Sequence, residues 1–275
     1  MAYRIHHINT LTMCPPGRAL VNGNGSVFSA GRIICHCLLI ETEGGLILVD
    51  TGIGSADVAD PVARLGWEFA HITRPQLDQK HTAVAQVARL GFKTSDVRHI
   101  VMTHLDVDHA GGLPDFPDAQ VHVFHAEHHA ASQPLWDDRF RYKPVQWAHA
   151  PKWVIHRPIG ERWLGFDSVK ALDDDILLIP LEGHSRGHCG VAIRTQEGWL
   201  LHAGDAYFHH TEMTDTPNCP FALNAFQRLI ASDYGQRTRN LSRLKSLARE
   251  HNDVLVHCAH CPTEYDRLAL TPLVA

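Results

Sequence analysis

The sequence predicts a layered α/β sandwich. Short apolar runs with strand character alternate with segments of helical spacing, and strand-rich stretches in both halves of the chain are followed by helices. The chain has 275 residues, which is enough for one large α/β domain with a rigid core. Because no internal repeat or linker divides it, we expect a single domain over residues 1–275.

The N-terminal half begins with a loop and continues with a pair of strands. Residues 14–32 are rich in Gly, Pro and Asn, which indicates a long surface loop before the first strand. Residues 33–50 predict two strands joined by a tight turn at Gly44 and Gly45. Residues 82–92 are expected to form a helix, and residues 97–103 a buried strand. Residues 120–131 are expected to form a strand that runs into a short helix.

The middle of the chain, from Pro134 to Phe166, is dense in aromatic residues and has no clear period. We predict short helices and loops there, with the aromatic side chains forming the wall of an apolar cleft. A satellite core beneath a loop is the alternative interpretation. In the C-terminal half, we expect three strands at residues 175–181, 189–195 and 198–205. A long polar helix at residues 236–251 and a last strand at residues 253–260 should follow.

The most informative motif is VMTHLDVDHAGGL, residues 101–113, which places His104, Asp106, Asp108 and His109 within one short stretch. A close-packed core would need a separate partner for each of these polar side chains. Because the motif follows a strand, it is expected to lie on a loop, where the side chains can converge on a metal ion. A solvated polar turn is the alternative.

Three further stretches favour the metal site over the polar turn. LEGHSRGHCG, LLHAGDAYF and VLVHCAHCP place His184, Asp205 and His260, respectively, directly after apolar strands. Potential ligands that repeatedly follow strands are expected when a site lies at one edge of a sheet sandwich. The count of 22 histidines also raises the expectation of a metal site, because histidine is the commonest protein metal ligand.

In their order along the chain, these motifs resemble those of the metallo-β-lactamase superfamily. The stretch VDTG, Val49 to Gly52, is similar to an early motif of that superfamily, and the resemblance extends over about Ile33 to Tyr265. It implies an αββα four-layer sandwich of two mixed β-sheets flanked by helices. It also implies a dinuclear metal site between the sheets.

The resemblance assigns seven metal ligands to two ions. One ion would bind His104, Asp106 and His184, the other would bind Asp108, His109 and His260, and Asp205 would bridge the two. Asp50 would support the ligand loop from outside, as such sites normally require. Zinc is the first choice for the ions, because mixed nitrogen and oxygen sites bind it well.

Asp106 departs from the pattern, since most hydrolases of this superfamily have His at that position. Three carboxylates and a bridging hydroxide would neutralise two divalent cations, whereas His at position 106 would leave one positive charge. A neutral centre should polarise a carbonyl group less and attract anionic substrates less. The additional oxygen ligand makes manganese or iron possible.

Other candidate residues favour structural roles. His188, His202, His209 and His210 are expected to support the ligands or to pack, and His125 and His129, spaced i and i+4, lack an evident third ligand. Cys258 and Cys261 form a C-x-x-C motif around His260. A redox pair is one interpretation, but we expect buried thiols because no helix N-terminus is evident to activate them.

Tyr207 is a candidate catalytic residue. Lactonases of the superfamily place a Tyr beside the substrate carbonyl, three residues after the bridging Asp. Here Tyr207 follows Asp205 by two residues, and Phe208 occupies the third position. Contact with the substrate and a packing role are therefore both open for Tyr207.

The resemblance implies hydrolysis of a lactone or ester. A water that bridges two cations can supply hydroxide near neutral pH, and Asp108 could carry a proton to the leaving oxygen. The layout looks most like the N-acyl homoserine lactonase branch. Alternatives are a thioesterase like glyoxalase II, a β-lactamase, a phosphotriesterase, a flavodiiron-like oxidoreductase, a nuclease and a non-catalytic binding module.

Composition limits the partners. A net charge of −5 argues against nucleic acid, and no apolar run reaches the length of about 18 residues that a membrane span needs. The N-terminus lacks the pattern of a signal peptide, and the seven cysteines suggest no disulfide framework, so we expect a cytoplasmic protein. The expected partner is a small-molecule substrate with an apolar part, and a homodimer is possible.

Overall fold

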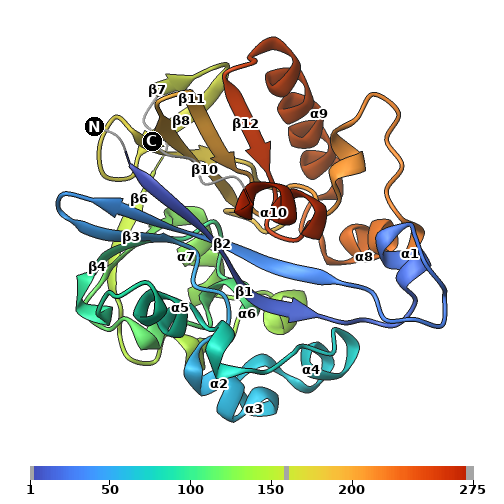
Figure 1. The fold of residues 1–275 in the computed structure, drawn as a ribbon, viewed down its shortest axis with the longest axis horizontal. Helices are drawn as coiled ribbons and strands as arrows, with labels where there is room; N and C mark the ends of the chain where they lie inside the picture. Colours follow the sequence, from blue (N-terminus) through green and yellow to red (C-terminus); the bar gives the residue numbers. More distant parts are fainter. Residues whose placement is uncertain (1–2, 158–160, 271–275) are drawn as a thin grey trace.

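A computed structural model describes residues 3–157 and 161–270, and it shows two six-stranded mixed sheets packed face to face with helices outside them (Figure 1). The expected αββα four-layer sandwich is confirmed. The first sheet has the order β1-β2-β3-β4-β5-β6, antiparallel from β1 to β3 and parallel from β3 to β6. Its strands are β1 (Arg4–Met13), β2 (Ile33–Thr42), β3 (Gly45–Val49), β4 (Val97–Val101), β5 (Gln120–Phe124) and β6 (Lys152–His156).

The second sheet has the order β12-β11-β10-β9-β8-β7, in which only β11 and β12 are parallel among the strand pairs of the described residues. Its strands are β7 (Glu161–Trp163), β8 (Phe166–Lys170), β9 (Ile176–Pro180), β10 (Cys189–Thr195), β11 (Gly198–His202) and β12 (Val254–His257). Strand β10 is a continuous apolar run up to Arg194, as expected for a strand covered on both faces.

The helices form the two outer layers. In the N-terminal half they are α1 (Arg18–Asn22), α2 (Ser55–Ala59), α3 (Pro61–Leu65), α4 (Trp67–Ile72), α5 (Ala83–Arg89), α6 (Val107–Ala110) and α7 (His125–Ser132). In the C-terminal half they are α8 (Phe221–Ile230), α9 (Tyr234–Glu250) and α10 (Pro262–Ala269). None of the helices in the described part of the chain is long and apolar enough to cross a membrane.

The described residues form four apolar core clusters, and the three largest lie between the layers. The central core lies between the sheets and includes the fully buried Leu38, Val101 and Val191. A second core lies between the first sheet and its helices, around Val87 and Val121, and a third lies between the second sheet and α9, around Leu244. Because strand side chains alternate between faces, each sheet contributes to the central core and to one outer core.

The predicted strands and helices outside the middle segment are confirmed, but the structure contains further elements that were not expected. Residues 14–32 were expected to be a loop before the first strand, but β1 precedes them and α1 lies within them. The sequence of β1 hid its strand character, because polar residues such as His6, Asn9 and Thr12 interrupt the apolar pattern. Other elements that were not expected are α2, α3, α4, α8, α10 and β8 (Phe166–Lys170). The ligand motif was expected to lie on a loop, but Asp108 and His109 lie on the short helix α6.

The middle segment also differs from the expectation, since it contains β6 and β7 in addition to short helical turns such as η4 (Trp136–Phe140). Residues 158–160 of this segment lie outside the described residues. Most of its aromatic side chains pack in the cores, as the alternative interpretation required: Tyr142, Trp147, Trp153, Trp163 and Phe166. Trp136 and Phe140 remain exposed, at 78% and 53% of their surface.

Leu38→Ala should lower the free energy of unfolding by about 2–5 kcal/mol, because it opens a cavity between the two sheets. Urea denaturation followed by circular dichroism measures this change. Leu229→Ala is the matched control, since Leu229 is 83% exposed and its removal should change stability by at most about 0.5 kcal/mol. Equal effects of the two substitutions would contradict the assignment of the central core.

Candidate metal centre

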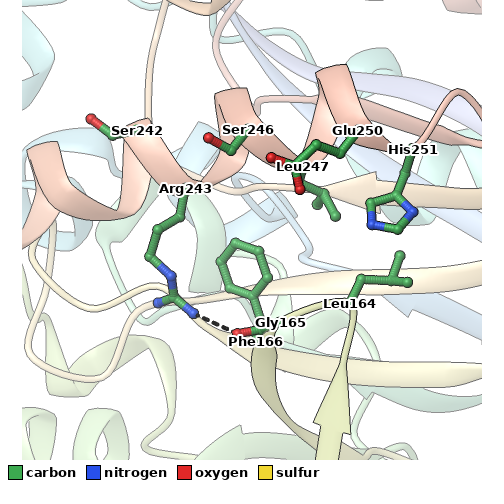
Figure 2. Close-up of a pocket in the computed structure, with 9 residues that line it drawn as sticks. All are labelled: Leu164, Gly165, Phe166, Ser242, Arg243, Ser246, Leu247, Glu250 and His251. Carbon is green, nitrogen blue, oxygen red and sulfur yellow. Dashed lines mark hydrogen bonds between the residues drawn. The ribbon is translucent and has the colours of Figure 1, made fainter.

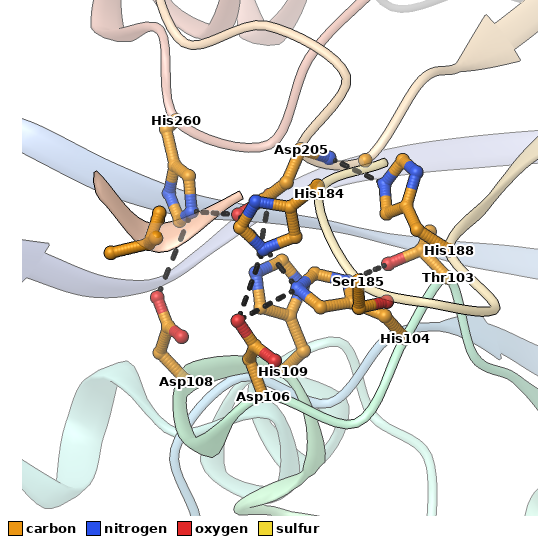
Figure 3. A network of polar contacts seen from close by, with 12 residues as sticks. Thr103, His104, Asp106, Asp108, His109, His184, Ser185, His188, Asp205 and His260 are labelled. Atoms are coloured by element: carbon orange, nitrogen blue, oxygen red, sulfur yellow. Dashed lines mark hydrogen bonds and ion pairs between the residues drawn. The ribbon is translucent and has the colours of Figure 1, made fainter. Parts of the chain in front are cut away.

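The predicted metal ligands all follow the C-terminal ends of strands, and the fold brings them to one edge of the sandwich (Figure 3). The first sheet supplies four of them after β4, and the second sheet supplies the other three after β9, β11 and β12: His104, Asp106, Asp108 and His109, then His184, Asp205 and His260. Most of these side chains are almost fully buried, and Asp205 is 2% exposed.

Four of the predicted ligands surround a first position. The Nε2 atoms of His104 and His184 lie 3.5 and 3.0 Å from Asp106 Oδ2. The same two nitrogens lie 3.7 and 3.4 Å from Asp205 Oδ2. Ligand atoms about 2.0–2.1 Å from a tetrahedral zinc ion would lie roughly 3.3 Å apart, so this donor set has the spacing that a metal ion requires.

The other ligands gather beside this position. His260 Nε2 lies 3.0 Å from Asp205 Oδ2 and 3.7 Å from Asp108 Oδ2, and His109 Nε2 lies 3.3 Å from Asp205 Oδ1. Asp205 thus presents its two oxygens to histidines of both sets, as a bridging ligand would. Cys35, on β2, also belongs here, because its thiol donates to Asp108 Oδ2 at 3.4 Å.

The chemistry of these donors fits divalent metal ions. His104 Nε2, His109 Nε2 and Asp205 Oδ1 are buried and lack a hydrogen-bond partner among the described residues. Burial of unpaired polar atoms is costly unless something binds them. A metal ion on each side of Asp205 would satisfy all three atoms.

Asp50, at the end of β3, fixes the first ligand loop. Its Oδ1 accepts from the Thr103 amide at 2.8 Å, and its Oδ2 accepts from the Thr103 hydroxyl at 2.7 Å and lies 2.9 Å from His109 Nδ1. Burial acts to raise the pKa of Asp50, but the charge and hydrogen bond of His109 hold it below its ordinary value. The carboxylate therefore stays ionised and orients the His109 ring.

Glu127, on α7, joins the two ligand loops. Its fully buried carboxylate accepts from the Leu105 amide at 2.9 Å, from the Ser185 hydroxyl at 2.7 Å and from the Gly187 amide at 3.0 Å. Leu105 lies between two ligands of the first sheet, and Ser185 follows His184. From the sequence, His125 and His129 were considered in this helix, and Glu127 was missed. Its position as a lone acidic residue on the buried side of the helix could have indicated its role.

Arg141 is a second residue that sequence reasoning missed. Its Nη1 donates to Asp106 Oδ1 and Oδ2 at 2.8 and 2.7 Å and lies 3.1 Å from His184 Nε2. Burial acts to raise the pKa of Asp106, but the charge of Arg141 contributes to a pKa well below the ordinary value. The negative charge that Asp106 adds to the ligand set is therefore matched by a cation outside it.

Tyr207 and Phe208 have different surroundings. Tyr207 is fully buried in the core beneath α9, and its hydroxyl donates to Glu264 at 3.0 Å. The Phe208 ring faces the metal centre, with its centroid 4.5 Å from that of His260 and 6.0 Å from that of His184. Phe226 of α8 lies next to it, at 6.2 Å, so apolar surface borders the ligands.

His188 and the two cysteines of the C-x-x-C motif lie close to the predicted ligands. His188 Nδ1 lies 2.9 Å from the Leu181 carbonyl oxygen and its Nε2 accepts from the Asp205 amide at 2.8 Å, so it positions the bridging residue. Cys258 and Cys261 are fully buried, as expected. The expected lack of a helix N-terminus was wrong, because Cys261 is the N-cap of α10, and a hydrogen bond from Cys258 lowers the pKa of the Cys261 thiol.

A surface hollow of about 300 Å³ lies elsewhere, between the turn Leu164–Phe166 and α9 (Figure 2). Arg243 crosses it, with its guanidinium 4.1 Å from the centre of the Phe166 ring. The hollow shares no residue with the metal centre.

Asp50→Asn should lower metal affinity about 10–100-fold, because the His109 ring loses its charged partner. Competition with a chromophoric chelator measures the affinity. Asp78→Asn, at an exposed ion pair with Lys80, is the control and should leave it unchanged. Equal affinities of the Asp50 variant and the parent chain would refute the role of Asp50.

Asp106→His should retain metal poorly by itself, because the substitution leaves the buried Arg141 without its carboxylate. Adding Arg141→Met should restore metal binding and shift the Zn-to-Mn ratio toward zinc. The Zn-to-Mn ratios of the parent chain and the double variant are measured by elemental analysis after each is loaded in a mixture of both metals. If the single variant binds metal as well as the double variant, Arg141 and Asp106 are not coupled.

Comparison with known proteins identifies the family of the chain. The family model described as "Metallo-beta-lactamase superfamily" matches residues 30–260. A "probable metallo-hydrolase" of Mycobacterium tuberculosis is 43% identical over 95% of this chain and 81% of its own length. An N-acyl homoserine lactonase of Bacillus thuringiensis is 27% identical over 90% of this chain and 92% of its own length.

Solved structures show the same fold. The structure of an N-acyl homoserine lactone hydrolase, with the product N-hexanoyl-L-homoserine bound at its catalytic metal centre, superposes with a TM-score of 0.74 at 21% identity. It covers 98% of this chain and 97% of its own. The match to the family model spans most of the chain, from before β2 to His260. The chain belongs to the metallo-β-lactamase superfamily.

Proposed function

We propose that the chain is a dinuclear metal-dependent hydrolase that opens a lactone or ester. The observation that carries the proposal is the convergence of seven histidine and aspartate side chains at one edge. Three of their buried atoms lack a hydrogen-bond partner within residues 3–157 and 161–270. Relatives described as metallo-hydrolases and lactonases support hydrolysis as the reaction class. Zinc is the first choice of metal, with manganese or iron as alternatives.

Each ligand has a defined role in the proposal. His104, Asp106 and His184 would hold one ion, Asp108, His109 and His260 would hold the other, and Asp205 would bridge them. When bound, the ions would activate water near neutral pH and polarise a carbonyl group. Cys35 lies close enough to Asp108 to act as a further ligand or to orient that carboxylate.

Asp108 is the proposed proton carrier. Its side chain is 11% exposed, more than that of Asp205 at 3%, so it borders the space that a substrate would enter. From there it could deliver a proton to the leaving oxygen. Tyr207 would have to release Glu264 before its hydroxyl could reach a substrate, so we assign the substrate side to Phe208.

The proposed substrate has an apolar part. Phe208 borders the ligands and Phe226 lies next to it. Trp136 and Phe140 are exposed on η4, whose C-cap residue Arg141 lies beside Asp106. Burial of an acyl chain contributes about 0.8 kcal/mol per methylene group. This surface therefore favours lactones with longer acyl chains over short or charged esters.

The direct test is hydrolysis by the metal-loaded chain of a panel of lactones, thioesters, phosphotriesters and β-lactams. We expect lactones to give the highest kcat/KM, and we expect about two metal ions per chain by elemental analysis. His109→Ala should lose one ion and most turnover. If a thioester or phosphotriester is hydrolysed fastest, that compound class replaces lactones as the proposed substrate. If the loaded chain holds only trace metal, the proposal is overturned.

Chain-length preference tests the apolar surface. Across an acyl series, kcat/KM should rise by up to about fourfold per methylene group, as the burial energy allows. Trp136→Ala and Phe140→Ala should flatten the series, whereas Leu90→Ala, at the C-cap of helix α5, should not. A flat series in the parent chain would show that this surface does not bind substrate.

A further inference from the structure

Four histidines outside the metal centre gather at one end of the core between the sheets. His7 and His36 lie on β1 and β2 of the first sheet, and His202 and His257 are register partners on β11 and β12 of the second. Helix α10 contacts β1 and β2 and covers this end, as Figure 1 shows. There the Tyr265 ring packs edge-on against His36, with centroids 5.0 Å apart.

Hydrogen bonds leave three ring nitrogens of this cluster without a partner. His7 Nδ1 and His36 Nε2 lie 2.8 Å apart, and His257 Nδ1 lies 3.4 Å from the Cys258 carbonyl oxygen. The second nitrogen of each of these rings is buried and has no hydrogen-bond partner in the described part of the chain. His36 and His257 are 1% and 0% exposed, so these unpaired atoms carry the full cost of burial.

His202 differs from the other three because both of its ring nitrogens are occupied. Nε2 lies 2.7 Å from the His36 carbonyl oxygen, and Nδ1 accepts from the Gly204 amide at 3.2 Å. It joins β11 to β2 through the backbone. It is therefore a support for the cluster and not a free ligand.

We propose that His7, His36 and His257 form an accessory binding site for one transition-metal ion of the class that prefers imidazole, with zinc as the reference ion. One ring nitrogen from each residue lies within 4.8 Å of the other two. The three rings come from three strands of two sheets, β1, β2 and β12. Three histidines with a fourth position for water are a known form of zinc coordination.

The donor set selects the metal. No carboxylate belongs to this group, so oxygen-preferring ions such as manganese lack a suitable ligand, whereas zinc, copper and nickel accept imidazole. Burial lowers the pKa of His7 to about 4 and keeps the pKa of His257 well below the ordinary value. These two rings are therefore neutral, which is the form that binds metal.

The test compares metal uptake by the parent chain and by His257→Asn. Each metal-depleted protein is dialysed against excess zinc or excess manganese, and bound metal is counted by elemental analysis. The parent chain should bind one more zinc ion than the variant, and the two should bind equal amounts of manganese. His71→Gln, at an exposed histidine, is the control and should behave as the parent chain.

The difference isolates the accessory site, because the metal centre is unchanged in all of these proteins. His7→Gln, at a partly exposed position, provides a second variant if His257→Asn does not fold, and it should also lose one zinc ion. Cobalt loading adds a spectroscopic readout, since the parent-minus-variant spectrum should show the visible bands of one bound ion. Equal zinc uptake by parent and folded variants, or an extra manganese ion in the parent alone, would overturn the proposal.

Discussion

The concentration of acidic side chains at one edge of two sheets is the constraint on which the rest of this structure depends. Asp106, Asp108 and Asp205 share histidine neighbours in a largely buried site. Carboxylates in such surroundings repel one another strongly because little water screens them. Only cations, fixed hydrogen-bond donors and rigid loops can hold them in place, and each of these is present around the site.

The fixed donors lie outside the ligand set. Asp50 and Glu127 are themselves buried acids, and their hydrogen bonds hold the backbone and rings that carry the ligands. Arg141 supplies a permanent positive charge against Asp106. The negative charge of Asp106 and the positive charge of Arg141 therefore offset each other in this chain.

The sequence was sufficient to identify the sandwich and the side chains that meet at its edge, because each polar side chain follows an apolar strand such as the one before Asp205. It was not sufficient for residues whose roles depend on long-range packing. Arg141, Glu127 and Cys35 come from a turn, a helix face and a strand, with no local pattern that predicts contact with the ligands. Strand β1 was missed for a related reason, since a fully buried position of this strand holds the polar residue Thr10.

The division of the ligands between the two sheets has a mechanical consequence. Four ligands follow a strand of one sheet and three follow strands of the other, so ions bound between them would link the two sheets. A ligand present at 100 times its dissociation constant stabilises the folded state by about 2.7 kcal/mol. Without metal, the two sheets would then separate first at the edge that carries the ligands. The resistance of these ligand loops to proteolysis would increase with the concentration of bound metal.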